Sequence, residues 1–375
     1  MVSVVIITYN VEKYITRCIE SVINQTYSDI EIIIVNSDST DRTGDICRQY
    51  AKLDSRINYV HKESEGPGAA RTRGFEKSTG KYITFVDGDD WLEGDAVEIL
   101  YKKAEELQAD IVLGDILYVF EDIETENLLK SYSKIRLDEQ VCISGRQDVS
   151  IINKCRTFTW GKLYRREFLK ENKFAQNLYT YEDLATVPVL FAQAKKVGYV
   201  NKPIYNYLRN RGTSLVNDKS RAKEMVIALS ELNKNFYRLD DYEYFKDELK
   251  RLMWGQIRFV CLKHPICMVK ENFTDSLYEK MICVITECFD DFIEPDKCDV
   301  RVINAEYAKI ILKNIVINDD AVRYITDSED CRRRILVSYE GKELEYCLEN
   351  ISEDEVVDES KMWNAVDDIF RKIWC

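Results

Sequence analysis

The sequence has few of the residues that build metal–sulfur sites, nucleic-acid surfaces or membrane spans. Only two histidines, His61 and His264, occur among 375 residues, and the twelve cysteines are scattered without a CxxC pair. This pattern predicts reduced core cysteines in a cytosolic protein, not a structural zinc site. The net charge of −13 argues against general nucleic-acid binding. No apolar run approaches the roughly 18 residues of a membrane span, and no basic leader typical of a signal peptide is expected at the N-terminus.

What the sequence does contain is a regular alternation of apolar runs and amphipathic stretches. The runs at 2–8, 30–35, 57–60, 81–86 and 109–122 predict buried strands, with helices between them. This spacing predicts an α/β fold with a mostly parallel central sheet flanked by helices. Residues 123–150 are expected to be irregular. Helical patterns near 220–237, 242–263 and 274–292 predict a mainly helical region over 216–375, after a first domain over 1–215.

Carboxylates are crowded at the end of one predicted strand, in "FVDGDDWL" (85–92). Asp87, Asp89 and Asp90 repel one another unless a cation joins them, and hard oxygen ligands favour Mg²⁺, Mn²⁺ or Ca²⁺. The alternative is an acidic surface turn in which Asp90 serves as the anion at the start of the next helix. Polar residues also follow the first two strands, as "TYN" (8–10) and "NSDSTD" (36–41). Ligands of open α/β sheets bind at such strand ends, so the three loops predict one site.

Three ordered segments make the N-terminal half resemble the family-2 inverting glycosyltransferases, which have the nucleotide-diphospho-sugar (GT-A-like) fold. They are "VSVVIITYNVEKYITRCIESVINQTYSDIEIIIVNSDSTDRT", "GPGAARTRGFEKSTGKYITFVDGDDWL" and "WGKLYRREFL…YEDLATVPVLFAQAKK". The resemblance covers roughly residues 1 to 215. It implies that Asp89 is a direct ligand of Mn²⁺ or Mg²⁺ and that Asp87 contacts the ribose or assists the ion. The ion would act as a Lewis acid on the departing nucleoside diphosphate.

The same resemblance implies nucleotide-binding roles at the first two strand ends. Tyr9 would lie against the base and Thr8 at the edge between sugar and base; the alternative is a strand end with Asn10 as a turn residue. Asn36 occupies the base-contacting position. Asp38 stands where the family has glycine, which implies an unusual backbone angle that Asp tolerates better than most residues. Ser39 and Asp41 are also candidates for helix capping.

Two further motifs carry the remaining implied roles. Arg71 matches the family arginine that holds the nucleotide. Glu182 and Asp183 match the family Glu-Asp pair, in which the Asp is the general base that takes the proton from the acceptor hydroxyl. The segment from Thr180 to Asp183 also has the pattern of a capping box, and the two interpretations are compatible.

Two aromatic residues and one basic stretch lie beside these motifs. Trp91 and Trp160, with Glu182, are candidates for contact with a sugar acceptor, and core packing is the alternative for both tryptophans. The basic residues face either a diphosphate or solvent. They are Lys154, Arg156, Lys162, Arg165, Arg166, Lys170 and Lys173.

Together these features predict a cytoplasmic, metal-dependent, inverting hexosyltransferase. Its donor would be a nucleotide-diphosphate sugar, in the first place a UDP-sugar, and its acceptor a saccharide or a lipid-linked saccharide in surface polysaccharide synthesis. Peripheral association with the inner face of the membrane and a homo-oligomer remain open, and no nucleic-acid partner is expected. The alternatives are a non-catalytic sugar-nucleotide-binding or scaffold protein and a nucleotidyltransferase, although "TYNVEKY" lacks the basic, glycine-rich phosphate loop that the latter needs.

Overall fold

The computed structural model describes most of the chain up to residue 289 and three short strands beyond it. The described residues are 1–289 apart from 64–65, 122–127, 134, 136, 138–143, 171–173, 175–177, 210–222 and 264–273, followed by 322–326, 333–339 and 342–348. Contacts divide the chain into two compact units. One unit comprises 1–260 and 270–293, and the other comprises 261–269 and 294–375. The predicted domain boundary at residue 215 stays a prediction.

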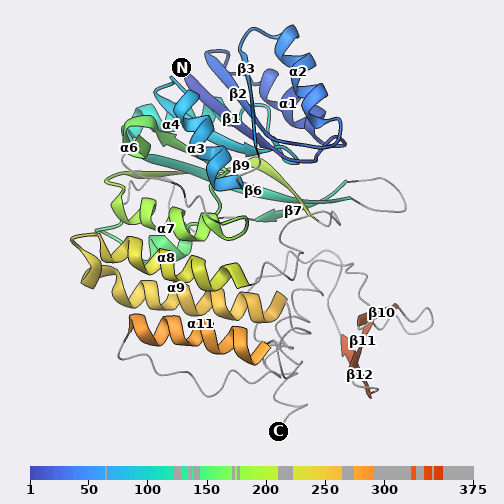
Figure 1. The fold of residues 1–375 in the computed structure, drawn as a ribbon, viewed down its shortest axis with the longest axis vertical. Helices are drawn as coiled ribbons and strands as arrows, with labels where there is room; N and C mark the ends of the chain where they lie inside the picture. The colour runs from blue at the N-terminus through green and yellow to red at the C-terminus, as the bar shows by residue number, and fades with distance from the viewer. Residues whose placement is uncertain are drawn as a thin grey trace. The chain divides into compact units, whose positions relative to one another are not determined.

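A nine-stranded sheet forms the centre of the first unit (Figure 1), in the order β3-β2-β1-β4-β8-β6-β9-β5 with β7 beside β6. Its strands are β1 (Val2–Thr8), β2 (Ile30–Ser37), β3 (Ile57–Lys62), β4 (Tyr82–Asp87), β5 (Trp91–Leu92), β6 (Ile111–Glu121), β7 (Leu128–Ser133), β8 (Lys162–Arg165) and β9 (Val197–Arg209).

The first four strands of the sheet are parallel, whereas β8 is antiparallel to both β4 and β6. β7 and β5 are also antiparallel to their neighbours, and β9 runs parallel to β6. The predicted α/β class is therefore confirmed, with a sheet that is parallel at its N-terminal side and mixed beyond β4. β7 lies within the stretch that was expected to be irregular, so that expectation is wrong for 128–133.

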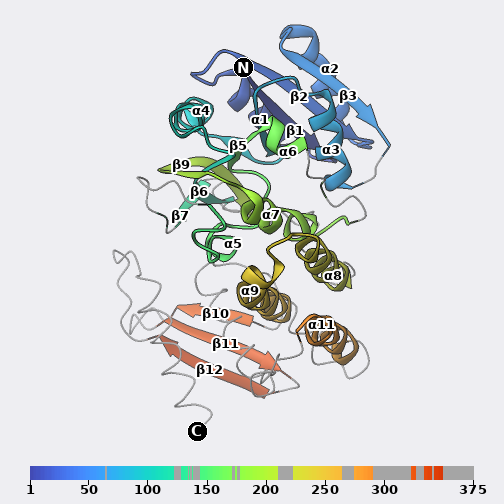
Figure 2. The same cartoon turned by 90° about the vertical axis from the view of Figure 1, so that its left-hand side faces the viewer.

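Helices cover both faces of the sheet because the apolar strands must be buried on both sides. They are α1 (Ile15–Ile23), α2 (Thr43–Leu53), α3 (Pro67–Lys77), α4 (Ala96–Leu107), α5 (Ile151–Lys154), α6 (Arg166–Lys170) and α7 (Glu182–Gln193). α3 and α4 lie on opposite sides of the sheet (Figure 2). All seven residues of β1 are buried. Val4 and Ile6 pack into one core with α1 and α4, whereas Val5 faces α3.

Gly74 explains how α3 comes so close to the sheet. A Cβ atom at this position would lie only 2.1 Å from Cγ1 of Val5, so no other residue fits without displacing the helix. Gly74 is thus a packing residue between α3 and β1. The close approach sets α3, and with it Arg71, over the ends of the parallel strands.

Three further helices lie beyond α7 (Figure 1) and belong at least in part to the first unit. They are α8 (Glu224–Tyr237), α9 (Tyr242–Lys263) and α11 (Thr274–Cys288). α8 packs on α7, where Nδ2 of Asn235 donates to the Ala185 carbonyl at 3.1 Å. The predicted helices thus form. None of the described helices has an apolar stretch long enough to cross a bilayer.

The described part of the second unit is a three-stranded antiparallel sheet. It consists of β10 (Val322–Thr326), β11 (Arg333–Tyr339) and β12 (Lys342–Leu348), in that order. The prediction of a mainly helical C-terminal region did not include these strands.

Candidate active site at the ends of the parallel strands

Strand register brings the three polar loops together, as their sequence positions predict. Thr8 is paired with Asn36 across β1 and β2, and Ile7 is paired with Asp87 across β1 and β4. All three strands are parallel, so their carboxyl ends meet at one edge of the sheet. The turn after β4 is held against β1, because the Gly88 backbone N–H donates to the Ile7 carbonyl at 2.9 Å.

At the ends of β1 and β2 the side chains form a neutral hydrogen-bonded network. Oδ1 of Asn36 accepts from the Ser39 hydroxyl at 2.6 Å and from the Thr8 hydroxyl at 3.3 Å. Nδ2 of Asn36 donates to the Tyr59 hydroxyl at 3.1 Å. Asn36 is only 2% exposed, so its carbonyl oxygen is committed to protein partners. The predicted contact between Asn36 and a base stays a prediction. In the same region Tyr9 is 47% exposed, and Asp38 is exposed as well.

Backbone angles and hydrogen bonds at this edge test several sequence predictions. Asp38 has φ of 58°, the unusual angle expected where the family has glycine. Asp41 accepts from the Thr43 backbone N–H at 3.0 Å just ahead of α2, but α2 begins at an Arg42 N-cap and has no side-chain cap, so the predicted capping role is not borne out. Ser39 does not cap it, since its hydroxyl donates to Asn36. Asn10 has φ of 49° and its Oδ1 accepts from the Thr40 N–H at 2.8 Å, as a turn residue would.

Negative charge dominates the carboxyl end of β4 and the start of α7, where one buried arginine lies among three carboxylates. Nη1 of Arg71 lies 2.5 Å from Oε1 of Glu182 and 3.2 Å from Oδ1 of Asp183, and its Nη2 lies 3.1 Å from Oδ1 of Asp87. Arg71 is 2% exposed. Loss of water opposes its charge, but Asp183, Asp87 and Glu182 together hold the pKa of Arg71 well above its ordinary value.

The carboxylates themselves are not all neutralised by this arginine. Burial and the charge of Asp183 raise the pKa of Glu182 to about 8, against the opposing effect of Arg71. Loss of water raises the pKa of Asp87 to about 6, with further increases from Asp89 and Asp183. Raised values of this kind mark a place where a further positive charge would be stabilising.

Asp90 belongs to the scaffold of this site. Its Oδ2 accepts from the Tyr205 hydroxyl and its Oδ1 from the Leu208 N–H, both at 2.8 Å. It is fully buried, so the alternative in which Asp90 is the anion of an exposed helix-capping turn is wrong. Tyr205 also accepts from the Asp87 N–H at 3.1 Å. β9 therefore fixes the acidic turn through a tyrosine 115 residues away from Asp90.

The remaining pair, Asp87 and Asp89, has the chemistry for Mg²⁺ or Mn²⁺. Asp87 is the last residue of β4 and Asp89 lies two residues beyond it, and the Asp87 side chain is 27% exposed. Within the described ranges no cluster of three or more His, Cys, Asp or Glu side chains is arranged to hold an ion by itself. Mg²⁺ typically takes one or two carboxylates and completes its shell with substrate phosphates and water. The donor set thus fits an ion that arrives with a diphosphate.

Asp183 is held by a residue that the sequence did not single out. The Thr159 backbone N–H donates to its Oδ2 at 3.1 Å, and the Thr159 hydroxyl donates to its Oδ1. The predicted capping box is wrong, because α7 has no side-chain cap and the Thr180 hydroxyl bonds to Glu224 instead. Nothing in the spacing of Thr159 and Asp183, which are 24 residues apart, signals their contact.

The two tryptophans have different environments. Trp160 is 2% exposed and stacks with Phe158 and Tyr205, each at a centroid distance of 4.3 Å, so the packing alternative accounts for its position. Trp91 is partly exposed, and the Arg17 guanidinium lies 3.7 Å from its ring centre. The acceptor roles of Trp91, Trp160 and Glu182 stay predictions. Of the basic stretch, Lys162 is buried at 1% exposure, and Lys173 lies outside the described residues.

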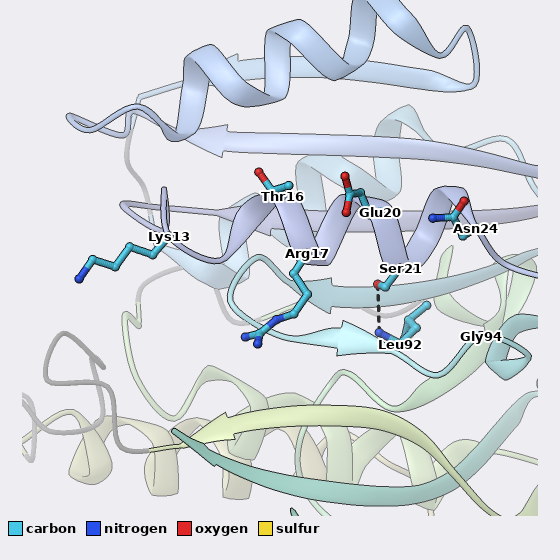
Figure 3. Close-up of a pocket in the computed structure, with 8 residues that line it drawn as sticks. All are labelled: Lys13, Thr16, Arg17, Glu20, Ser21, Asn24, Leu92 and Gly94. Atoms are coloured by element: carbon cyan, nitrogen blue, oxygen red, sulfur yellow. Dashed lines mark hydrogen bonds between the residues drawn. The ribbon is translucent and has the colours of Figure 1, made fainter. Parts of the chain in front are cut away.

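An open groove of about 490 Å³ runs along α1 and β5 (Figure 3). The Leu92 N–H donates to Oγ of Ser21 across it, at 3.2 Å. Its lining residues are Lys13, Thr16, Arg17, Glu20, Ser21, Asn24, Leu92 and Gly94. The carboxylates around Arg71 are not among them, so the groove is separate from the candidate site.

Comparisons with known proteins agree with this geometry. The family model described as "Glycosyl transferase family 2" matches residues 3–172. Putative glycosyltransferase EpsH of Bacillus subtilis is 32% identical over 300 residues, which cover 77% of this chain and 83% of that protein. Glycosyltransferase GlyG of Streptococcus pneumoniae is 31% identical, over 74% of this chain and 97% of that protein. Glycosyltransferase GlyA of the same species is 35% identical, but the match spans only 34% of its length.

Among solved structures, residues 1–349 of S. aureus TarS in complex with UDP-GlcNAc have the same fold. The TM-score is 0.63 over 94% of this chain and 99% of that one, at 16% sequence identity. With a matching family model and relatives that align over most of their own length, the chain belongs to glycosyl transferase family 2 and is a glycosyltransferase.

Proposed function

We propose that this glycosyltransferase moves a sugar, with inversion, from a UDP-sugar to a saccharide or lipid-linked saccharide acceptor, with Mn²⁺ or Mg²⁺ as cofactor. The observation that carries the proposal is the pairing of two distant motifs through one buried side chain. Arg71 contacts Asp87 of the acidic turn and also Glu182 and Asp183 of α7. This contact supports a proposed cation site and a proposed general base that would lie beside each other at the strand ends.

In this proposal each group has a distinct task. Asp89 and Asp87 hold the cation, which when bound offsets the negative charge of the diphosphate. Tyr9, Thr8 and Asn36 lie at the nucleotide end of the rim, and Arg71 fixes the position of Asp87. The relative TarS, whose structure was solved with UDP-GlcNAc and with UDP, supports UDP as the first nucleotide to test.

Asp183 accepts the proton of the acceptor hydroxyl as that oxygen forms a bond to C1 of the donor sugar. The bond between C1 and the diphosphate oxygen breaks on the opposite side, and the electron pair leaves with the nucleoside diphosphate. A single attack from the far side inverts the anomeric centre.

Asp183→Asn tests this assignment. Nucleotide release is first measured with a panel of UDP-, GDP- and TDP-sugars in Mn²⁺, and the most active donor is then used for the variant. We expect turnover to fall about 10²–10⁴-fold, while calorimetry shows little change in donor affinity. Asp45→Asn is the matched control, because Asp45 pairs with Arg48 on the surface of α2. Full turnover in Asp183→Asn would show that the base assignment is wrong; no donor binding by the unaltered protein would favour the scaffold alternative.

The setting follows from the donor and acceptor classes. A lipid-linked acceptor and a cytoplasmic nucleotide sugar meet at the inner face of the membrane, so peripheral association there belongs to the proposal, as does a role in surface polysaccharide synthesis. Co-sedimentation of the protein with vesicles of bacterial lipid checks this part separately from catalysis.

A further inference from the structure

A short segment ahead of β8 contacts both oxygens of the proposed base. Thr159 uses its backbone N–H for Oδ2 of Asp183, at 3.1 Å, and its hydroxyl for Oδ1. Thr159 itself is fully buried. A carboxylate bound by two donors at separate oxygens cannot rotate about its last torsion, which is otherwise a broad and soft one. Thr159 therefore restricts the orientation of Asp183, together with Arg71, whose Nη1 lies 3.2 Å from Oδ1.

The backbone of this segment is in turn held by two side chains of β8. Nζ of Lys162 donates to the Phe158 carbonyl at 2.5 Å and to the Trp160 carbonyl at 3.5 Å. The Tyr164 hydroxyl donates to the Thr159 carbonyl at 2.9 Å. Lys162 and Tyr164 are two residues apart on one strand and so share a face of the sheet. Three successive carbonyls around Thr159 are thus each bonded to a side chain.

The burial of Lys162 indicates that its hydrogen bonds to this segment are part of the folded structure and not a chance surface contact. A buried amine is costly unless its hydrogen bonds are satisfied, and here backbone carbonyls are its partners. Burial lowers the pKa of Lys162 to about 8. The chain also turns at Gly161, which has φ of 68°, and the Trp160 ring stacks on Phe158 and Tyr205. The segment is therefore fixed from several sides.

We propose that Thr159 is a positioning residue that orients Asp183 for proton transfer, and that Lys162 and Tyr164 hold Thr159 in place. This inference rests on the proposed role of Asp183 as base. Thr159 acts through Asp183 and needs no contact with either substrate. Its effect should therefore appear in the rate of the chemical step and not in donor affinity, because a misplacement of about 1 Å can cost on the order of 10²-fold in rate.

Thr159→Val removes the hydroxyl while keeping the side-chain shape and the backbone N–H. With UDP-glucose, UDP-galactose and UDP-N-acetylglucosamine as the test donors in Mn²⁺, we expect kcat to fall about 10- to 100-fold and KM for the donor to change less than about twofold. Thr159→Ser, which restores a hydroxyl, should recover kcat to within about threefold of the unaltered protein. Thermal melts establish that each variant is folded. Should Thr159→Val fail to fold, Tyr164→Phe carries the same test, with an expected loss of about fivefold.

The same substitution in an Asp183→Asn background separates this inference from the proposed function. If Thr159 acts through Asp183, Thr159→Val should cause no further loss there. An equal loss in both backgrounds, or full kcat in Thr159→Val or Tyr164→Phe, would overturn the positioning role while leaving Asp183 as base. Full activity of Asp183→Asn alone would overturn the base assignment and the positioning role with it.

Discussion

Two neighbouring parts of the same sheet edge are built from opposite chemistry. At the ends of β1 and β2, Thr8, Asn36 and Ser39 form a neutral network in which the described donors and acceptors bond to one another. At the end of β4 and the start of α7, several carboxylates surround a single arginine. Burial, together with the neighbouring carboxylates, raises the pKa values of Asp87 and Glu182. In the first region the hydrogen-bonding oxygen of Asn36 already has protein partners. The second has an excess of negative charge that an external cation would offset, and this difference separates the nucleotide end of the rim from the diphosphate end.

The largest expected effect comes from removing a carboxylate of the acidic region. Asp89→Ala should lower sugar transfer about 10³-fold or more, because a metal contributes several kcal/mol to the stabilisation of charge in the transition state. Asp45→Ala serves as control, since that carboxylate lies exposed in a surface ion pair. Transfer rates in Mn²⁺ check the prediction. An Asp89→Ala variant with undiminished transfer would contradict the claim that the acidic region, unlike the neutral one, works with an external cation.

Removing the arginine should destabilise the charged region even without any ligand. Arg71→Met leaves buried carboxylates without their cation, and we expect a loss of about 3–5 kcal/mol in the free energy of unfolding. Urea denaturation measures this loss. Arg56→Met is the matched control, because Arg56 pairs with Asp54 at a partly exposed position and such pairs contribute about 0–1 kcal/mol. Equal losses in both variants would contradict the claim that Arg71 offsets the charge of the buried carboxylates.

The charged region should also make stability depend on pH. The pKa of Glu182 is raised to about 8 in the folded protein, so between its ordinary value and pH 8 the folded state holds a proton that the unfolded state releases. This contribution is complete below about pH 4.5 and is lost as the pH rises through about 8; Asp87, raised to about 6, acts in the same direction.

Melting temperatures of the metal-free protein from pH 5.5 to 8.5 test this dependence. We expect Tm to fall with rising pH, and Glu182→Gln to flatten the fall. Glu231→Gln is the control, because Glu231 forms an exposed pair with Lys234 on α8 and should leave the slope unchanged. A Tm that rises over the same pH range would contradict the expected loss of stability as Glu182 ionises.

The smallest effect is expected on the neutral side. Ser39→Ala removes one hydrogen bond donated to Asn36 and one accepted from the Asn10 N–H. The free energy of unfolding should fall by about 1 kcal/mol, the usual net value of a hydrogen bond, with nucleotide affinity changed less than about threefold. Urea denaturation and calorimetry check the two parts. A loss in the free energy of unfolding as large as that of Arg71→Met would contradict the expected difference between the neutral network and the charged region.

Local patterns explain why the neutral side was the more predictable from sequence. The continuous apolar runs of β1 and β2 are what strands buried on both faces require, and the polar residues that follow them had to meet at one edge. Asp38 in place of a family glycine correctly indicated its left-handed backbone angle. The position of Asp87 at a strand end also placed it at this edge, whereas Arg71 and Asp183 were implied only by the family resemblance.

Long-range pairings explain what the sequence could not predict. β8 is short, carries a buried lysine, and is inserted antiparallel between β4 and β6, so no apolar pattern revealed its place in the sheet. The partners of Asp90 and Asp183 are Tyr205 and Thr159, and only tertiary structure brings them together. Thr180 fits a capping pattern locally, but α8 offers it Glu224 as a stronger acceptor. Local propensity was overridden there by a charged partner.

The central claim is that the acidic region binds a cation together with a nucleoside diphosphate. Calorimetric titration of UDP into the protein, once in Mn²⁺ and once in EDTA, tests it most directly, with Asp89→Ala measured alongside. Because the coupling between two ligands is reciprocal, we expect Mn²⁺ to tighten UDP binding at least about tenfold in the unaltered protein and to have no such effect in Asp89→Ala. Equal UDP affinity in Mn²⁺ and in EDTA for the unaltered protein would contradict the claim.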